Sequence, residues 1–336
     1  MSIKKQSIPM NILISIFILL TFLSTACLAD NSNDIQPVRS SPSPGVTEIH
    51  NIQYVPRGDA AQTLDLYIPT QASAKPLPLV VWIHGGGWEG GSKDWCYPAP
   101  LVAHGYAVAS VEYRFSQKAV FPAQIQDCQA AIRWLRANSK AYNLDPRHIG
   151  VGGDSAGGHL ASLVGTSGGS NAFPPIGGNA DQSDRVEAVL DVYGPSDFSA
   201  VVSQAAADKT KNVYDFNHGD PYSSLIGVPL GSDPEKDNAV SPMHYVSKSS
   251  PPFLILHGTA DQMVPFAQSL ELRDALLKNK INVILQPFPD ATHGDPIILG
   301  NPAVFEMVKT FFDKYLRHQK TTIELLPASA VSKQPH

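Results

Sequence analysis

The feature that most restricts the fold of this chain is the alternation of short apolar strands with amphipathic helices. Eight segments have strand-like patterns: TEIHNIQYV (47–55), TLDLYIP (63–69), PLVVWIHGG (78–86), YAVASVEYR (106–114), HIGVGG (148–153), VEAVLDVYG (186–194), FLILHG (253–258) and NVILQPFP (282–289). The first two alternate apolar with polar residues, which is typical of antiparallel edge strands with one solvent-exposed face. The later segments have solid apolar centres, which are typical of parallel strands covered on both faces.

Helical patterns at residues 122–142, 265–280 and 302–318 separate or follow the later strands. Strands that alternate with helices predict an α/β fold, here an eight-stranded, mostly parallel sheet with helices on both faces. Residues 196–250, between the sixth and seventh strands, are polar and irregular. An insertion of this length predicts a small lid-like excursion over a site.

The composition is globular: 336 residues, of which 43% are hydrophobic and 16% charged. We expect one catalytic domain over residues 46–318, preceded by a flexible leader at 30–45 and followed by a loose tail at 319–336. The formal net charge is −5, and Lys and Arg do not cluster outside the extreme N-terminus. A nucleic-acid partner is therefore not expected. The sequence leaves the oligomeric state open.

The N-terminus has the pattern of an export signal. Lys4 and Lys5 precede the apolar run ILISIFILLTFL, and the small residues of STACLAD follow it. The run is short for a membrane span, so residues 1–29 are interpreted as a signal peptide, and the mature chain is expected to have no membrane span. This predicts a periplasmic or secreted protein. Anchoring as a lipoprotein through Cys27 is the alternative, although Ser24 stands where a lipobox has a large aliphatic residue.

The glycine-rich stretch GVGGDSAGGHLA (150–161) has three interpretations: a nucleophile elbow, a loop that binds the phosphates of a nucleotide or dinucleotide, or a tight corner with no chemistry. A phosphate loop needs a Lys after its glycines, and a dinucleotide loop needs a glycine where Ser155 stands. The pattern G-x-S-x-G fits residues 153–157, after a strand and before a helix, as in an elbow that exposes a serine. A second copy, at residues 165–169, ends a helix and is interpreted as a helix exit.

A serine nucleophile needs a base, and the base needs an orienting acid. Asp261 lies in the loop after the seventh strand and His293 in the loop after the eighth, so with Ser155 they follow the order expected in a hydrolase sheet. The carboxyl ends of these strands meet at one edge of the sheet. Asp290 and Asp295 are rivals for the acid, but both are too close to the histidine in sequence to need that loop.

The segment HGGGW follows the third strand and predicts an oxyanion hole. We assign the backbone N–H groups of Gly86, Gly87 and Ala156 to it, because such donors stabilise a developing oxyanion. Trp88 and Asp154 are candidates for the substrate pocket. Asp154 is also expected to shape the elbow, and packing is the alternative role for Trp88.

Two further histidines and two cysteines receive structural interpretations. His257, at a strand end, is expected to form structural hydrogen bonds, and His159 is expected to point away from Ser155. In an oxidising compartment, Cys96 and Cys128 favour a disulfide, with two buried thiols as the alternative. No Cys/His spacing resembles a metal site.

The motifs together resemble the α/β-hydrolase superfamily, and within it the carboxylesterases related to bifunctional feruloyl and acetyl-xylan esterases. The resemblance covers residues 46 to about 316 and rests on HGGGWEGGSKD, GYAVASVEYR, FPAQIQDCQAAIRWLR, GGDSAGGHLA, DVYGPSD, SPMHYV, PPFLILHGTADQMVPFAQS and the HG at His293. Hormone-sensitive-lipase-like esterases share HGGG and GDSAGG, but the loop HGTADQMVP favours the first group. The resemblance also implies that Cys96 and Cys128 pair.

These observations predict a serine carboxylesterase that hydrolyses short-chain carboxylic esters through an acyl-enzyme, with a small-molecule ester as its substrate and no cofactor or metal. An amidase, a formamidase or a peptidase with the same triad is the alternative. A peptidase usually carries an additional domain that selects peptides, and none is evident. A hydrolase fold that serves only as a binding module typically lacks a triad residue, whereas all three are present here.

Overall fold

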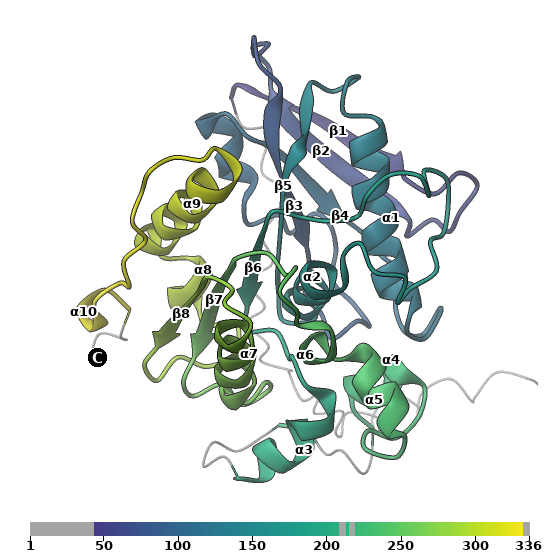
Figure 1. Ribbon diagram of the computed structural model, residues 1–336, viewed down its shortest axis with the longest axis vertical. Helices are drawn as coiled ribbons and strands as arrows, with labels where there is room; N and C mark the ends of the chain where they lie inside the picture. The colour runs from purple at the N-terminus through teal and green to yellow at the C-terminus, as the bar shows by residue number, and fades with distance from the viewer. Residues whose placement is uncertain (1–43, 208–212, 215–218, 332–336) are drawn as a thin grey trace, which may run out of the picture. The chain divides into compact units, whose positions relative to one another are not determined.

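The computed structural model describes residues 44–207, 213–214 and 219–331 (Figure 1). Within them, eight strands form one sheet in the order β1-β2-β4-β3-β5-β6-β7-β8. The strands are β1 (Val46–Gln53), β2 (Thr63–Pro69), β3 (Leu77–Ile83), β4 (Ala107–Val111), β5 (Leu144–Asp154), β6 (Ala188–Val192), β7 (Phe253–Gly258) and β8 (Val283–Phe288). β2 runs antiparallel to β1 and β4, and all other neighbours are parallel. The predicted fold class is confirmed.

Helices connect the strands and cover the sheet. They are the 3-10 helix η1 (Ala99–His104), α1 (Ala123–Ala137), α2 (Ala156–Ser167), α3 (Phe198–Ala207), α4 (Pro221–Ile226), α5 (Pro234–Val240), α6 (Pro242–Tyr245), α7 (Ala267–Lys278), α8 (Pro296–Leu299), α9 (Pro302–Leu316) and α10 (Ala328–Val331). The three predicted helices correspond to α1, α7 and α9. The second G-x-S-x-G copy lies at the exit of α2, as expected, because that helix ends at Ser167.

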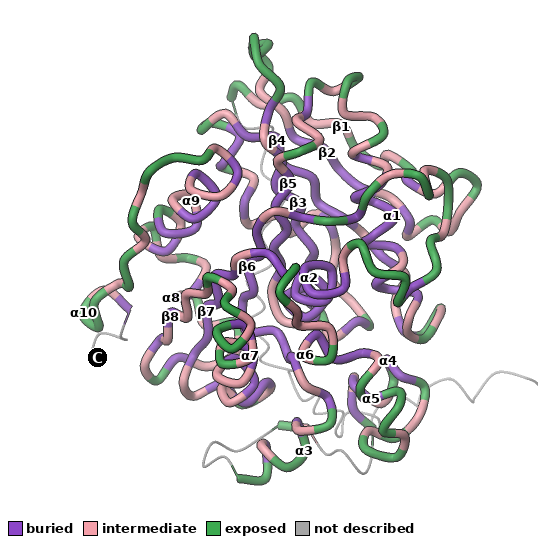
Figure 2. The backbone as a smooth tube through the Cα atoms, in the orientation of Figure 1, coloured by how far each residue is buried: buried purple, intermediate pink, exposed green. Residues whose placement is uncertain are grey.

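Side chains on alternate positions of the strands build two separate hydrophobic cores. Leu79, Val81 and Ile83 of β3 pack with α1, α2 and α7, whereas Val80 and Trp82 pack with η1, α8 and α9. Figure 1 shows α1 and α2 on one side of the sheet and α9 on the other. The strands at the centre are buried on both faces (Figure 2). This burial explains their solid apolar sequences.

The antiparallel edge differs in one respect from the expectation. β1 is partly exposed along its length, but β2 is buried on both faces. The polar residue that this buries, Asp65, forms an ion pair with Lys93 at 3.0 Å and a hydrogen bond with His50 at 2.8 Å. Partners of this kind make the burial of a charged residue tolerable.

The excursion at residues 196–250 is more regular than its sequence suggests, because it contains α3, α4, α5 and α6. Its short helices are capped locally: the carboxylates of Asp220 and Asp233 accept N–H groups at the start of α4 and α5. Its two ends are tied together by bonds from Met243 N–H to Ser196 O and from Phe198 N–H to Ser241 Oγ. The polar sequence therefore reflects capping residues between short helices.

The tail after residue 318 is not loose over its described part, up to residue 331. Leu326 N–H donates to Gln286 Oε1 on β8, and Asn301 Nδ2 donates to Ala330 O. Val331 is buried against the α9 side of the sheet. A few apolar side chains without periodicity are sufficient to hold this segment in place, which is why the sequence pattern did not indicate it.

The predicted disulfide is not formed, because Cys96 and Cys128 are both free thiols. Cys128 lies on α1 in one hydrophobic core, whereas Cys96 packs against the core on the other face of the sheet. A disulfide needs neighbouring Cα atoms, and the sheet separates these two. Burial raises the pKa of Cys96 to about 12 and that of Cys128 well above its ordinary value.

The predicted signal peptide, Cys27 and nearly all of the leader lie outside the described residues. Among the residues that are described, no helix has the length and apolar character needed to cross a membrane.

Candidate active site

Ser155 sits in a sharp turn between β5 and α2, with the unusual backbone angles φ 52° and ψ −119°. Close packing forces this turn and explains its glycines. A Cβ atom on Gly157 would lie 2.0 Å from Ile83 O, and one on Gly153 would lie 2.5 Å from the same atom. Ser155 N–H donates to Val192 O at 2.9 Å, which anchors the turn to the end of β6. Strain of this kind persists only where the surroundings enforce it.

The structure brings the three predicted triad residues together. His293 Nδ1 lies 2.7 Å from Asp261 Oδ2, and His293 Nε2 lies 2.8 Å from Ser155 Oγ. The three side chains come from separate loops, after β5, β7 and β8, at the carboxyl edge of the parallel strands. Since a carboxylate only accepts hydrogen bonds, His293 carries its proton on Nδ1 and leaves Nε2 free to accept the serine hydroxyl.

Asp261 is buried, yet its surroundings favour the charged carboxylate. Burial by itself would raise its pKa, but the nearby charge of His293 and hydrogen bonds from His257 and His293 together lower the pKa well below its usual range. Oδ1 also accepts the N–H groups of Met263 and Val264, each at 2.8 Å. The acid is therefore charged whenever His293 is available as a base.

The glycine loop after β3 lies directly beside the serine. A Cβ atom on Gly85 would lie 3.2 Å from Ser155 Cβ. Gly86 and Gly87 have φ values of 111° and 61°, in the region that favours glycine. Within the described part of the chain, no acceptor is found for the N–H groups of Gly86 or Gly87. Ala156 N–H, at the first turn of α2, has no intrahelical partner either. Among the described residues, these three N–H groups therefore have no hydrogen-bond acceptor.

Two side chains hold the glycine loop in this conformation. Asp154 Oδ1 accepts Gly85 N–H at 3.1 Å, so this candidate pocket residue joins the elbow to the loop. His84 is buried, with Nδ1 2.7 Å from Gly85 O and Nε2 2.8 Å from Glu112 Oε1. Burial raises the pKa of Asp154, and His84, Gly85 N–H and His293 partly offset that effect. The HGGG motif thus includes the histidine that orients its own loop.

Trp88 packs inside an aromatic cluster rather than against open space. Its ring lies 5.7 Å from that of Phe198 and 5.5 Å from that of Tyr222. Trp88 Nε1 donates to His159 Nδ1 at 3.2 Å, and His159 Nε2 donates to Val240 O at 2.8 Å. Burial lowers the pKa of His159 to about 4, so it stays neutral. This cluster ties the glycine loop to the excursion.

Sequence reasoning missed two contacts at the site. The ring of Tyr193 lies 4.6 Å from that of His293, and its backbone has φ 45°, which is rare for a large side chain. His257 Nε2 lies 3.2 Å from Asp261 Oδ2, so a second histidine faces the same carboxylate oxygen. The segments DVYG and HGTAD contain both residues, but only tertiary contact shows what they touch.

The rival acids lie elsewhere in their loop. Asp295 caps α8 by accepting Ile297 N–H at 3.2 Å. Asp290 follows a turn in which its own N–H donates to Thr259 Oγ1. The two histidine rings at the site, His293 and His257, instead share Asp261.

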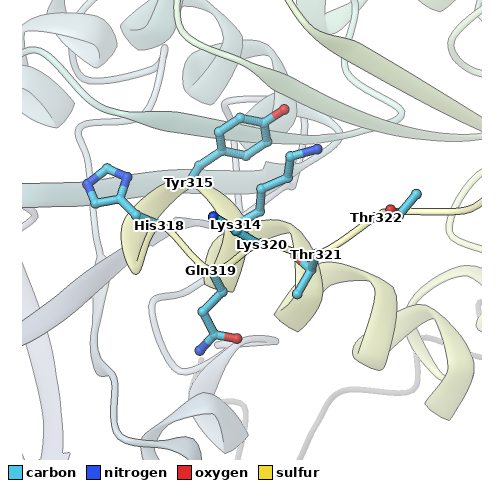
Figure 3. A pocket seen from close by; sticks show the side chains of 7 residues that line it. All are labelled: Lys314, Tyr315, His318, Gln319, Lys320, Thr321 and Thr322. Atoms are coloured by element: carbon cyan, nitrogen blue, oxygen red, sulfur yellow. The ribbon is translucent and has the colours of Figure 1, made fainter.

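Two cavities lie outside the triad. One of about 570 Å³ is lined by Lys314, Tyr315, His318, Gln319, Lys320, Thr321 and Thr322 (Figure 3). His318 contacts His148 near the start of β5, whereas Ser155 follows its end, so this cavity lies at the opposite edge of the sheet. A second cavity of about 280 Å³ is lined by Asp59, Ala61, Arg114, Phe115, Gln117 and Lys118. It adjoins the glycine loop, because Gln117 Nε2 donates to Glu89 O.

A sheet of this order with a serine elbow, an acid and a histidine on successive loops defines the chain as an α/β-hydrolase. The BD-FAE family model matches residues 64–276, well over half of the chain. The chain belongs to the BD-FAE family, which confirms the resemblance derived from its motifs.

Named relatives agree with this assignment. The chain is similar to Esterase LipC of Mycobacterium tuberculosis, with 28% identity over 75% of this chain and 61% of the relative. It is also similar to Esterase LipQ of the same organism, with 32% identity over 72% of this chain and 56% of the relative. The chain thus spans less than two thirds of the length of these relatives. A solved structure of a truncated carbohydrate esterase from gut microbiota aligns with TM-score 0.73 and 28% identity, covering 83% of this chain and all of that one.

Proposed function

We propose that this chain is a serine carboxylesterase that hydrolyses short-chain carboxylic esters through an acyl-enzyme. The observation that carries the proposal is the continuous hydrogen-bonded line from Ser155 Oγ through His293 to Asp261, with distances of 2.8 Å and 2.7 Å. The names of the relatives, both esterases, support the same reaction class.

The geometry suits each step of the reaction. Ser155 Oγ attacks the ester carbonyl carbon while His293 Nε2 takes the hydroxyl proton, and the charged carboxylate of Asp261 stabilises the imidazolium that forms. The developing oxyanion accepts the N–H groups of Gly86, Gly87 and Ala156, each worth roughly 3 kcal/mol in comparable sites. His293 then gives its proton to the leaving alcohol and activates the water that releases the acid.

The packing around the glycine loop supports a preference for short acyl chains. A Cβ atom on Gly87 would lie 3.3 Å from Pro221 Cβ, so α4 of the excursion closes on that side of the loop. Trp88 and Tyr222 fill the space behind it. A small acyl group fits this packing best.

The test compares purified protein with the Ser155→Ala variant on p-nitrophenyl acetate and p-nitrophenyl octanoate. Loss of a triad nucleophile can lower turnover by on the order of a millionfold, so the variant should fall to background. Acetate should be hydrolysed faster than octanoate. Equal rates for the two proteins would refute the mechanism. If esters fail but arylformamides or peptides are cleaved in a Ser155-dependent way, the amidase or peptidase alternative replaces the esterase.

We also propose that the enzyme is exported, which the pattern of residues 1–29 supports. Expression of the full chain followed by separation of cytoplasm, periplasm and medium tests this. Mass spectrometry of the mature N-terminus distinguishes cleavage by a signal peptidase from lipidation at Cys27. Activity confined to the cytoplasm, with an intact N-terminus, would refute export.

A further inference from the structure

Asp261 is held by a second histidine that the triad mechanism does not use. His257 lies at the end of β7 and is fully buried. Its Nε2 lies 3.2 Å from Asp261 Oδ2 and 3.1 Å from Val264 O, and its Nδ1 lies 2.7 Å from Ser269 Oγ. The inference below rests on the proposed esterase mechanism.

The partners of His257 determine where its proton sits. Nε2 faces a carboxylate oxygen and a carbonyl oxygen, both of which only accept hydrogen bonds, so Nε2 carries the hydrogen. Nδ1 then accepts the hydroxyl of Ser269 on α7. Both ring nitrogens of His257 then have hydrogen-bond partners inside the protein.

This tautomer completes the set of donors around the acid. Oδ2 of Asp261 receives His293 Nδ1–H and His257 Nε2–H, and Oδ1 receives the N–H groups of Met263 and Val264. An ionised carboxylate has about four lone-pair directions, and these four donors match them. The carboxylate can therefore neither rotate nor gain a proton without losing a hydrogen bond.

We propose that His257 is a positioning residue: its Nε2–H fixes the Asp261 carboxylate so that Oδ2 meets His293 Nδ1. It also moderates the acid. A carboxylate oxygen that already accepts one imidazole N–H attracts a proton on the second imidazole less strongly. The His257 donor therefore weakens the pull of the Asp261 carboxylate on the proton that it shares with His293 Nδ1.

Two substitutions separate this role from simple packing. The amide nitrogen of Gln reaches about as far from the backbone as Nε2 of His, whereas that of Asn reaches only as far as Nδ1. His257→Gln therefore keeps a donor to Asp261 and loses the bond to Ser269. His257→Asn keeps a partner for Ser269 and loses the donor to Asp261. Packing is disturbed in both variants, but the donor is absent in only one.

We expect His257→Asn to lower kcat by about 10- to 100-fold with KM little changed, because the acid becomes misplaced. The acidic limb of its kcat/KM profile should move to higher pH by about half a unit or more. His257→Gln should keep kcat within about threefold of wild type and leave the limb in place. The other titratable groups of the described residues that act on this cluster, Asp154, Tyr193, Tyr214 and Tyr222, are the same in both variants.

The proposal is overturned if the two variants behave alike in kcat, or if the acidic limb of His257→Asn stays in place or moves to lower pH. Should His257→Asn fail to fold, the nitrogen NMR spectrum of the wild-type protein decides, with the resonances assigned by comparison with His257→Gln. A hydrogen on Nε2 of His257 supports the proposal, and one on Nδ1 overturns it. Wild-type activity that survives Ser155→Ala would instead refute the esterase mechanism itself, so the two failures are distinguishable.

Discussion

Two buried aspartates, one in β6 and one in the loop after the neighbouring strand β7, have pKa values shifted in opposite directions. Asp261, after β7, is 2% exposed, and Asp191, in β6, is fully buried. The pKa of Asp261 is lowered below its usual range, whereas burial raises the pKa of Asp191 to about 7. Both side chains are almost completely inaccessible to solvent, so exposure alone does not explain the difference.

The partners explain it. Among the described residues, Asp261 receives four hydrogen bonds, two of them from imidazoles, whereas Asp191 receives one from Ser162 Oγ at 2.6 Å and one from Gly194 N–H at 2.9 Å. Two donors do not offset the loss of solvent around Asp191. The Asp261 carboxylate lies against His293, where the proposed mechanism forms an imidazolium, and Asp191 links Ser162 of α2 to the end of β6. The same residue type is assigned a catalytic role in one place and a structural role in the other.

Asp261→Asn should give the largest loss of activity, because it removes the charged carboxylate that distinguishes Asp261 from Asp191. The amide would present a hydrogen-bond donor to one of two imidazoles that also donate, so His293 would lose its correct tautomer. A comparable substitution in another serine hydrolase lowers kcat by about 10⁴, and we expect a loss of that order here. Steady-state hydrolysis of p-nitrophenyl acetate measures it.

Asp191→Asn serves as the matched control for this substitution. It makes the same chemical change at the same depth on the neighbouring strand, and we expect it to leave kcat within about threefold of wild type. Equal losses of kcat in the two variants would show that both buried aspartates are needed for the fold. The two residues would then not differ in function.

For thermal stability, in contrast to activity, we expect the substitution at Asp191 to have the clearer effect. Between about pH 4 and pH 7, folded Asp191 keeps a proton that the unfolded chain has lost, so its contribution to stability falls as the pH rises through this range. Asp191→Asn should remove that decrease and melt higher than wild type at pH 8, by about 2–4 °C for each kcal/mol gained. Thermal melting at pH 5 and pH 8 measures it, and equal melting curves at pH 8 would contradict the raised pKa.

The contribution of Asp261 to stability should change with pH in the opposite direction. Its pKa is lowered in the folded protein, so its contribution to stability is present above the ordinary aspartate pKa and is lost only as the solution becomes strongly acidic. Asp261→Asn is therefore expected to lower kcat, whereas Asp191→Asn is expected to raise the melting temperature at pH 8.

The placement of the triad residues and the glycines of the elbow could be predicted from the sequence. Ser155, Asp261 and His293 follow three strands, and the carboxyl ends of parallel strands must meet at one edge, so chain order alone brings them near each other. The glycines of the elbow were predictable because only glycine tolerates the close approach of Ile83 O.

What could not be predicted depends on side-chain partners across elements. The second histidine on Asp261 and the ring of Tyr193 against His293 need the positions of neighbouring loops, which no local pattern specifies. The predicted disulfide failed for the same reason: strand periodicity does not say on which face of the sheet Cys96 and Cys128 lie. The charge of a buried aspartate likewise depends on how many donors the fold brings to it.

Ser162→Ala makes the smallest change that still tests this explanation. It removes one of the two hydrogen bonds to Asp191, at a cost of about 1 kcal/mol, and leaves the triad untouched. Because that bond favours the charged carboxylate, its loss should raise the pKa of Asp191 further and move the pH-dependent fall in stability to higher pH. Melting curves at half-unit pH steps would show the displaced midpoint, with kcat unchanged. A midpoint that stays in place would mean that the hydroxyl does not set the charge of Asp191, and donor number would no longer explain why the two aspartates differ.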